Sequence, residues 1–320
     1  MSLTVAVQMD PLAGINIAGD STFALMLSAQ ARGHRLFHYA PEDLNQSGDR
    51  VWTQARPVTV QRVVGDHFAF GDAVSLDLGE QADVVLMRQD PPFDLGYITA
   101  THLLERISDR TLVVNDPASV RNAPEKLFVL DYQRFMPPTL ITRSVDEARK
   151  FLNEHGSIVV KPLHGNGGKA IFKIDADAQN LSSLIEVFNT AYREPHMVQA
   201  FLSAVAKGDK RIVLVDGEVA GAVNRLPGAG EIRSNLAVGG TAAKTELTDK
   251  EREICAALGP ELKRRGLIFV GIDVIGGEWL TEINVTSPTG IVSIETFDGT
   301  DTGGLIWDAI DTRLAERAAS

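Results

Sequence analysis

Two apolar segments separated by a pair of glycines near the carboxyl end constrain the fold of this chain more than any other feature. Residues 267–275 and 279–285 are rich in β-branched and other apolar side chains, and Gly276 and Gly277 lie between them. Two such segments joined by a tight glycine turn predict a β-hairpin.

The hairpin carries three polar residues that matter for function. Glu282 and Asn284 are two residues apart, so a strand points both to the same face. Asp273 on the partner strand is expected near them, and two carboxylates with an amide oxygen suit Mg²⁺, which proteins usually share with substrate phosphates. The alternative is a hairpin with solvated acids outside and Ile283 and Val285 facing the core. The hairpin alone leaves both open.

Length and charge limit the class of protein. The chain has 320 residues, enough for two or three domains with well-formed cores. Lys and Arg number 31 against 42 Asp and Glu, a formal net charge of −11, which makes binding to nucleic acid or to an anionic membrane unfavourable. Local basic clusters can still bind phosphate.

Cysteine usage and hydropathy favour a cytoplasmic protein. Cys255 is the single cysteine, so a disulfide within the chain is impossible, and its Ala- and Leu-rich surroundings favour a buried structural thiol over a nucleophile. No apolar run approaches the ~18 residues of a membrane span. The first residues lack the pattern of a secretion signal.

The first part of the chain is typical of an open α/β sheet. Residues 3–9 predict a strand that ends at Asp10, and Asp20 with its neighbours offers capping oxygens for a helix closed by Gly33. Ligands of such sheets bind at the carboxyl ends of strands. No G-x-G-x-x-G pattern is present, which disfavours a dinucleotide site. Residues 45–80 predict short strands and loops without an assigned function.

Arg88 follows a second predicted strand, residues 82–87, at a position suited to a ligand. A guanidinium there can hold a substrate carboxylate through two hydrogen bonds. The alternative is an ion pair with Asp90 or Asp94, and the residues alone leave both open.

A strand, a glycine-rich loop and a return strand occupy residues 157–174. Lys161 lies on the first strand, and the loop from His164 to Gly168 can wrap phosphate with its backbone N–H groups. With Lys126, the chain offers two point charges for phosphates. The pattern is not a G-x-x-x-x-G-K-[ST] loop, and an ordinary turn is the alternative.

A second loop follows Arg225 and runs to Asn235. Its Pro and Gly content argues against regular structure, and Arg225, Arg233 and Asn235 can close over an anionic intermediate. The alternative is a mobile surface loop with solvated arginines. Thr248 and Glu251 then form a capping-box pattern that starts a helix.

The segment Glu-Ile-Asn-Val-Thr-Ser-Pro at residues 282–288 resembles the carboxyl-terminal signature of the bacterial glutathione synthetases, which belong to the ATP-grasp ligases. Ten further motifs of that family occur in its order and near its spacing at residues 9–11, 15–17, 20–21, 86–88, 90–94, 122 with 125–128, 161–163, 208–211, 235–237 and 239–240. One such motif is a weak signal, whereas ten in sequence are specific. The resemblance extends from about residue 5 to the final helix.

The resemblance implies an α/β protein with an ATP-grasp fold. We expect an N-terminal open α/β substrate-binding domain at residues 1–121, a central lid domain at 122–198 and a C-terminal domain with the metal hairpin at 199–320. The implied reaction joins γ-glutamylcysteine and glycine, with ATP as co-substrate and an acyl phosphate as intermediate. Mg²⁺, with Mn²⁺ as an alternative, is the implied cofactor, and a homotetramer or dimer is the implied assembly.

The resemblance also implies roles for individual residues. The catalytic residues would be Arg211 and Arg225, and the metal ligands Asp273, Glu282 and Asn284. The ATP-binding residues would be Lys126, Lys161, Gly165, Gly167, Gly168, Gln199, Ala200, Phe201, Leu202 and Asp209. The substrate-binding residues would be Asp10, Asn16, Ser21, Arg88, Arg233 and Asn235.

Three positions depart from the family pattern. The lid has His164 where Asp is usual, a change of charge expected to alter nucleotide affinity or pH dependence rather than the reaction, and Gly290 and Val292 differ near the dipeptide site. Two alternatives stay open: a sister ligase of the RimK or D-alanine type, and a non-catalytic ATP-binding regulatory protein such as the synapsins. The amino-terminal motifs disfavour the first, and the complete set of Asp273, Glu282, Asn284 and Arg225 disfavours the second.

Overall fold

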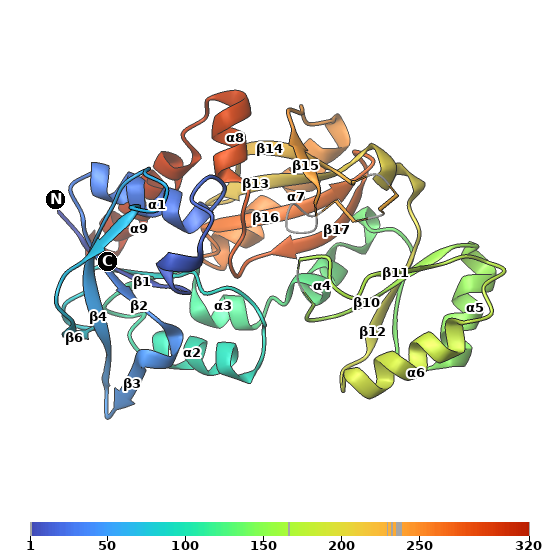
Figure 1. The fold of residues 1–320 in the computed structure, drawn as a ribbon, viewed down its shortest axis with the longest axis horizontal. Helices are drawn as coiled ribbons and strands as arrows, with labels where there is room; N and C mark the ends of the chain where they lie inside the picture. Colours follow the sequence, from blue (N-terminus) through green and yellow to red (C-terminus); the bar gives the residue numbers. More distant parts are fainter. Residues whose placement is uncertain (1, 166, 229, 232, 235–238, 320) are drawn as a thin grey trace.

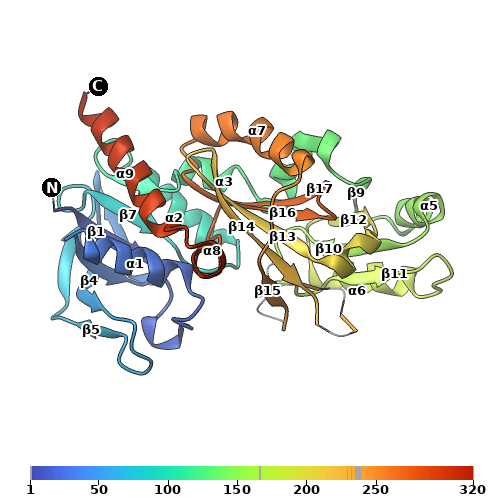
Figure 2. The same ribbon diagram turned by 90° about the horizontal axis from the view of Figure 1, so that it is seen from above.

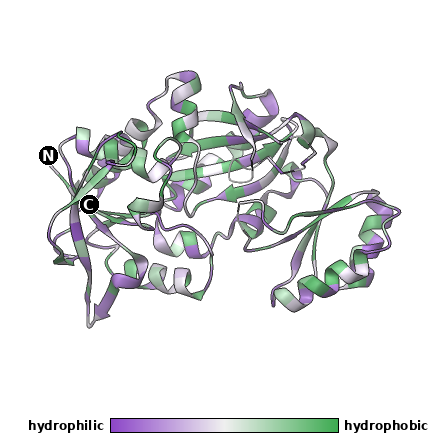
Figure 3. Cartoon of the chain, in the orientation of Figure 1, coloured by the Kyte–Doolittle hydropathy of each residue, from purple (hydrophilic) through white to green (hydrophobic). Residues whose placement is uncertain are grey.

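Three β-sheets form the framework of the computed structural model, which describes residues 2–319 except 166, 229, 232 and 235–238. In Figure 1 the N-terminal sheet lies at the left, the C-terminal sheet at the centre, and a small sheet with two helices projects at the right. Hydrophobic residues gather along the strands at the centre of the molecule (Figure 3). This arrangement confirms the mixed α/β architecture expected from the sequence.

The N-terminal sheet is parallel at its centre because its middle strands are apolar on both faces. Strand β1 (Thr4–Gln8) is buried throughout and pairs in parallel with β2 (Arg35–Tyr39) and β7 (Val84–Met87). The remaining strands are β8 (Leu112–Val114), β4 (Arg50–Val60), β3 (Leu44–Ser47), β5 (Phe68–Phe70) and β6 (Val74–Asp77). Strand β4 spans 11 residues, longer than the short strands expected in this region.

Helices flank this sheet. They are α1 (Ser21–Ala31), α2 (Leu95–Glu105) and α3 (Pro117–Arg121), with 3-10 turns at Leu12–Gly14 and Pro41–Asp43. Asp20 is the residue that caps α1, since its Oδ1 accepts a hydrogen bond from the N–H of Phe23 at 2.6 Å. Asp94 caps α2 in the same way through Tyr97.

The small sheet carries its own hydrophobic core. Its antiparallel strand order is β11 (Phe172–Ile174), β10 (Ile158–Pro162), β12 (His196–Ala200) and β9 (Thr139–Thr142), and helices α5 (Val145–His155) and α6 (Leu181–Ala191) pack on it. The return strand β11 begins later than predicted, because Gly167, Gly168 and Ala170 all have positive φ values that break the strand. Before the sheet lie α4 (Glu125–Phe128) and a 3-10 turn, Val129–Phe135.

The C-terminal sheet contains the predicted hairpin. Its antiparallel order is β15 (Thr241–Ala243), β14 (Glu218–Leu226), β13 (Asp209–Val215), β16 (Phe269–Ile275) and β17 (Trp279–Asn284). A 3-10 turn, Ser203–Lys207, leads into it, and helices α7 (Asp249–Arg264), α8 (Ile291–Asp298) and α9 (Thr302–Ala319) complete this part. Helix α7 begins with the predicted capping box between Thr248 and Glu251.

The N-terminal and C-terminal parts share a core. Helix α9 returns to pack on α1, as Figure 2 shows, and the buried Trp307 donates its indole N–H to the carbonyl of Leu25 at 3.0 Å. The segment after β7 contacts the segment after β17, since the hydroxyl of Ser287 donates to the carbonyl of Gln89 at 2.6 Å and Nη2 of Arg88 donates to the carbonyl of Pro288 at 2.9 Å. Of the helices that the structure describes, none is long and apolar enough to cross a membrane.

Candidate active site

A cavity of about 360 Å³ lies between the hairpin β16–β17, the glycine-rich loop after β10 and the segment that follows β7. Its walls bring together residues that are far apart in the sequence. The predicted site residues on its walls are Lys126, Lys161, Gly165, Gly167, Gly168, Gln199, Ala200, Phe201, Leu202, Asp209, Arg211, Arg225, Arg233, Asp273, Glu282 and Asn284. Their individual roles stay predictions, but the fold places them around one space.

Strand register explains how the hairpin presents its polar groups. Asp273 pairs directly with Glu282, and Asn284 pairs with Gly271, so all three side chains come to the same region of the sheet. The amide nitrogen of Asn284 donates to the carbonyl of Gly271 at 3.1 Å. This bond fixes the side chain and leaves its amide oxygen available to a ligand.

Asp273 is held by two arginines, Arg211 on the adjacent strand β13 and Arg225 on β14, one strand further away. Its carboxylate accepts hydrogen bonds from Nε and Nη2 of Arg211 at 2.6 and 3.1 Å and lies 3.0 Å from Nη2 of Arg225. Burial alone would raise the pKa of Asp273, but the two guanidiniums outweigh burial and hold it well below its usual range. The absence of a side chain at Gly271 leaves space for Arg211, since a Cβ at that position would lie 2.9 Å from the Cδ of Arg211.

Glu282 is held by two lysines from other elements. Nζ of Lys126 on α4 lies 3.3 Å from its Oε1, and Nζ of Lys161 on β10 lies 3.6 Å away. Burial raises the pKa of Glu282, and the lysines more than reverse this. Burial also lowers the pKa of Lys161, whereas for Lys126 the carboxylates of Glu282 and Glu125 outweigh burial and raise the pKa.

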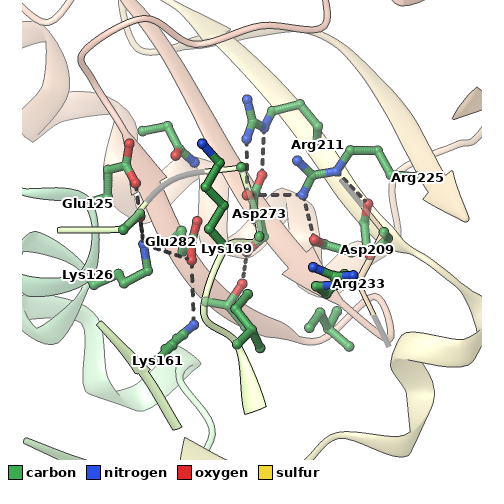
Figure 4. A pocket seen from close by; sticks show the side chains of 18 of the residues that line it. Glu125, Lys126, Lys161, Lys169, Asp209, Arg211, Arg225, Arg233, Asp273 and Glu282 are labelled. Carbon is green, nitrogen blue, oxygen red and sulfur yellow. Dashed lines mark hydrogen bonds and ion pairs between the residues drawn. The ribbon is translucent and has the colours of Figure 1, made fainter. Parts of the chain in front are cut away.

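The charged groups alternate in sign along two neighbouring chains of ion pairs, which Figure 4 shows at close range. The fold tolerates these buried charges because each of them lies next to an opposite charge. An incoming polyphosphate would bring negative charge to the basic side chains and release carboxylate oxygens for a cation. The first chain comprises Glu125, Lys126, Glu282 and Lys161. The second comprises Arg211, Asp273, Arg225 and Asp209.

The donor set fits a hard divalent cation that is shared with a ligand. Within the described residues, no three His, Cys, Asp or Glu side chains are arranged to hold a metal by themselves. Asp273 and Glu282 with the amide oxygen of Asn284 make two carboxylates and one neutral oxygen, the set that Mg²⁺ completes with water and substrate phosphates.

The other end of the cavity is apolar and lies where β12 leaves the small sheet. Gln199, Ala200, Phe201 and Leu202 line it there, and Nζ of Lys173 lies 4.7 Å from the ring centre of Phe201. Gln199 is fixed by a hydrogen bond to the hydroxyl of Thr139 at 2.9 Å. Further apolar walls come from Val159, Ile171, Val205 and Ile275. Apolar walls beside a cluster of basic side chains suit the base of a nucleotide.

Four predicted substrate-binding residues do not line this cavity. Asp10 accepts a hydrogen bond from the N–H of Asp90 at 2.7 Å, and Asn16 is exposed on the loop before α1. Ser21 accepts from the N–H of Gly290 at 3.2 Å. Arg88 is buried next to Pro288, and Asn235 falls outside the described residues.

Arg88 has neither of the ion pairs considered as an alternative. Its Nε donates to the hydroxyl of Thr22 at 3.0 Å and its Nη2 to the carbonyl of Pro288 at 2.9 Å. Within the described residues no carboxylate pairs with this guanidinium, which is 5% exposed. A buried cation held only by neutral groups is suited to an anionic ligand.

Sequence reasoning missed several groups on the cavity wall. Glu125 lies 3.5 Å from Lys126, and burial raises the pKa of its carboxyl group. The side chain of Lys169 extends into the cavity from the glycine-rich loop (Figure 4). Residues 287–290 line the end nearest the N-terminal sheet. Glu125 had a signal, its place beside Lys126 in a family motif, whereas the direction of Lys169 depends on the positive φ values around it.

Asp209 is a second carboxyl group in the site whose pKa lies above its ordinary value. Burial raises its pKa to about 7, although its Oδ2 lies 2.6 Å from Nη2 of Arg225, and its Oδ1 is buried without a hydrogen-bond partner. The unfolded value is about 3.9, so folding favours the protonated form. The contribution of this group to stability is therefore greatest below about pH 4 and is lost as the pH rises to about 7.

Asp209→Asn should remove this loss of stability. The free energy of unfolding of the variant, relative to that of the unaltered protein, is expected to rise by on the order of 2 to 4 kcal/mol as the pH increases from 4 to 8. Urea unfolding of both proteins at several pH values measures the difference. A difference that stays constant with pH would contradict the assignment.

The comparisons with known proteins agree with this geometry. A solved D-cycloserine synthetase, DcsG, superposes with a TM-score of 0.69 at 17% identity, covering 97% of this chain and 99% of that one. The ATP-grasp ligase PsnB with a minimal precursor superposes with a TM-score of 0.63 at 19% identity, covering 98% and 100%. The chain shares the fold of these ligases, and a family model identifies residues 125–299 as an ATP-grasp domain.

Sequence matches narrow the class to one family. The model of the prokaryotic glutathione synthetase N-terminal domain matches residues 3–121, and that of the prokaryotic glutathione synthetase ATP-grasp domain matches residues 125–299. The chain belongs to the prokaryotic glutathione synthetase family. The glutathione synthetase of Rhodopseudomonas palustris is 57% identical over 98% of this chain and 100% of its own length. That of Pseudomonas putida is 43% identical over 99% and 100%.

Proposed function

We propose that this chain is an ATP-dependent ligase that joins γ-glutamylcysteine and glycine to form glutathione, ADP and phosphate. The observation that carries this proposal is the cavity itself, in a chain of this family. It combines an apolar slot, a cluster of lysines and arginines, and a pair of facing carboxylates at one place. ATP and a divalent metal belong to the activity of this family.

Two chemical steps account for the reaction. In the first, an oxygen of the dipeptide carboxylate bonds to the γ-phosphorus as the bond to the β,γ-bridging oxygen breaks, and ADP leaves. In the second, the glycine amine bonds to the acyl carbon, the acyl C–O bond breaks, phosphate leaves, and the amine loses its proton to solvent. No side-chain nucleophile is needed. The site must supply charge stabilisation and exclusion of water.

The chain's own groups divide this work. Lys126 and Lys161 lie where they can neutralise phosphate oxygens, and Lys126 also donates to the lid carbonyl of Gly165 at 2.8 Å. Arg211 and Arg225 face the region of the hairpin where the transferring phosphoryl group and then the tetrahedral oxyanion would lie. Bound Mg²⁺, or Mn²⁺, held by Asp273, Glu282 and Asn284, would offset charge on the phosphates.

Arg88 is proposed to hold a carboxylate of the dipeptide. Arg88→Ala should raise the KM for γ-glutamylcysteine by roughly 10- to 100-fold, because a charge-assisted contact is lost, and should change the KM for ATP by less than about threefold. Steady-state kinetics with each substrate varied measures both constants. The control is Arg106→Ala, which removes a half-exposed arginine paired with Asp49 on the same part of the fold. Equal effects on both KM values would indicate a structural role for Arg88.

The proposed function is tested by phosphate release from Mg-ATP with γ-glutamylcysteine and glycine, each omitted in turn, and by mass analysis of the product. Release that requires both substrates and yields the tripeptide supports the proposal. Release with other amino acids alone would indicate a sister ligase. ATP binding without release would indicate a regulatory protein.

A cytoplasmic homotetramer or dimer is part of the same proposal. The resemblance to the family supports the assembly, and the single buried thiol of Cys255 supports a reducing compartment. Light scattering coupled to size exclusion would measure the assembly directly.

A further inference from the structure

One aromatic contact joins the glycine-rich lid loop to the N-terminal part of the molecule. The ring of His164, which follows β10, lies nearly parallel to the ring of Phe93, with centroids 5.8 Å apart and an interplanar angle of 25°. Phe93 in turn contacts the ring of Tyr97 at 5.3 Å, and Tyr97 is 2% exposed in the core of the N-terminal part. A lid residue is thus stacked on a ring that another domain anchors.

On the lid side, the contact continues directly into the phosphate-binding region. Gly165 follows His164, lines the cavity and accepts the hydrogen bond from Lys126. A Cβ on Gly165 would lie 2.6 Å from Cγ of Pro162, so the turn between the strand and the loop is tight. A shift of the His164 ring would therefore move the backbone of Gly165, which faces the proposed phosphate-binding region.

On the N-terminal side, the contact continues into the predicted dipeptide region. Phe93 lies three residues after Asp90, which lines the cavity and whose N–H bonds to Asp10. Arg88 begins this segment and donates to the carbonyl of Pro288. An anionic substrate bound at Arg88 would order this short segment. Phe93 would then also be fixed in place, because few freely rotating bonds separate it from Arg88.

The imidazole makes this contact as a neutral ring. Burial lowers the pKa of His164, and Lys126 lowers it further, while Glu194 acts in the opposite direction. Near pH 7 the stack is therefore between two uncharged aromatic rings, a contact that contributes through dispersion and shape. A carboxylate side chain at this position would have no ring to stack.

We propose that His164 is a positioning residue that couples the nucleotide lid to the dipeptide-binding segment through its stack on Phe93. The proposal rests on the proposed function, because it assigns the dipeptide to the segment that begins at Arg88. Coupling is reciprocal, so the nucleotide strengthens dipeptide binding by the same factor as the dipeptide strengthens nucleotide binding. This role differs from the change of lid charge that the sequence alone suggested.

The direct test is the dissociation constant of γ-glutamylcysteine, measured by calorimetry with and without saturating Mg-ADP, where no turnover takes place. In the unaltered protein Mg-ADP is expected to tighten dipeptide binding by roughly three- to tenfold, the size of one aromatic contact. His164→Ala and Phe93→Ala should each reduce this factor to near one, and the double variant should show no further change.

Two more variants separate coupling from general damage. His164→Phe keeps a ring and should restore the factor. His155→Ala is the matched control, because His155 contacts Phe151 in the same part of the chain at 4.3 Å and, among the described residues, has no ring contact or ion pair outside that part. It should leave the factor unchanged and should keep kcat at saturating substrates within about twofold of that of the unaltered protein.

The outcomes are distinguishable from failure of the proposed function. A factor near one in the unaltered protein, an unchanged factor in His164→Ala, or no restoration by His164→Phe would overturn the coupling. Absence of glutathione from an unaltered protein that still shows the factor would overturn the proposed function alone. Absence of dipeptide binding would overturn both.

Discussion

Glu282→Gln is expected to lower the rate of glutathione formation by about a thousandfold or more. The substitution keeps the shape of the side chain but removes the charge that faces Lys126 and Lys161 and that would bind the metal. Loss of one preorganised group at a transferring charge costs about 10²–10³ in rate, and loss of metal affinity adds to this. Release of ADP and phosphate under saturating substrates measures the effect.

The matched control lies in the same hairpin. Glu278→Gln changes an exposed acid in the turn between β16 and β17 and should leave turnover unchanged. Binding of Mn²⁺ in the presence of ADP, followed by electron paramagnetic resonance, gives a readout that does not depend on turnover and should weaken only in Glu282→Gln. Near-normal turnover of that variant at saturating Mg²⁺ would contradict the metal assignment.

The second large effect is expected from Arg225→Lys, which should lower kcat by roughly a hundredfold and change the KM for ATP by less than about fivefold. Nη2 of Arg225 contacts Asp209 at 2.6 Å and Asp273 at 3.0 Å, and its side chain is 6% exposed. A lysine ammonium cannot reproduce the planar fork that reaches both carboxylates and a phosphoryl oxygen. Positioning of charge in the transition state suffers more than ground-state binding.

Rapid-quench kinetics distinguishes the step that is affected. Arg225→Lys should slow formation of ADP in the first turnover, because the arginine is proposed to act on the transferring phosphoryl group. Arg264→Lys, which alters an exposed arginine paired with Glu261 on α7, is the control and should behave as the unaltered protein. A slow step confined to product release would be inconsistent with the proposed role of Arg225.

Local patterns in the sequence predicted most of the regular structure. The hairpin around Gly276 and Gly277 is present because a two-glycine turn and apolar strands are specified by neighbouring residues. The capping box of Thr248 and Glu251 is present with both hydrogen bonds, at 3.1 and 2.7 Å. The hairpin and the capping box each depend on a few neighbouring residues, so the local sequence is enough to predict them.

Two helices were not predicted. Helix α2 begins after Asp94, in a stretch for which no helix was expected. Helix α8 follows Gly290, whose φ of +119° suits glycine and which was noted only as a departure from the family. Helix α2 buries Tyr97, Ala100, Thr101 and Leu104, which lie at helical spacing, so a local signal for it was present and was missed. Helix α8 has only eight residues, so tertiary packing decides its presence.

The choice between alternatives for single residues also needed the fold. For Arg88 the sequence left an ion pair and a ligand role equally open, and the buried guanidinium pairs with neither Asp90 nor Asp94. For His164 the sequence indicated a change of charge, whereas the fold adds a stack on Phe93 from another domain. Both contacts join segments that are far apart in the sequence, so no local sequence pattern predicts them.

The sequence by itself determined the class of protein, the family and the set of chemical groups, because motifs and strand patterns are local and their order along the chain is specific. Only the tertiary structure decided that Lys126, Lys161 and Glu282 meet, that Arg211 and Arg225 both reach Asp273, and that the lid contacts the N-terminal part. The physical reason is that buried charges must be neutralised by whichever opposite charges the packing of three sheets brings within a few ångströms.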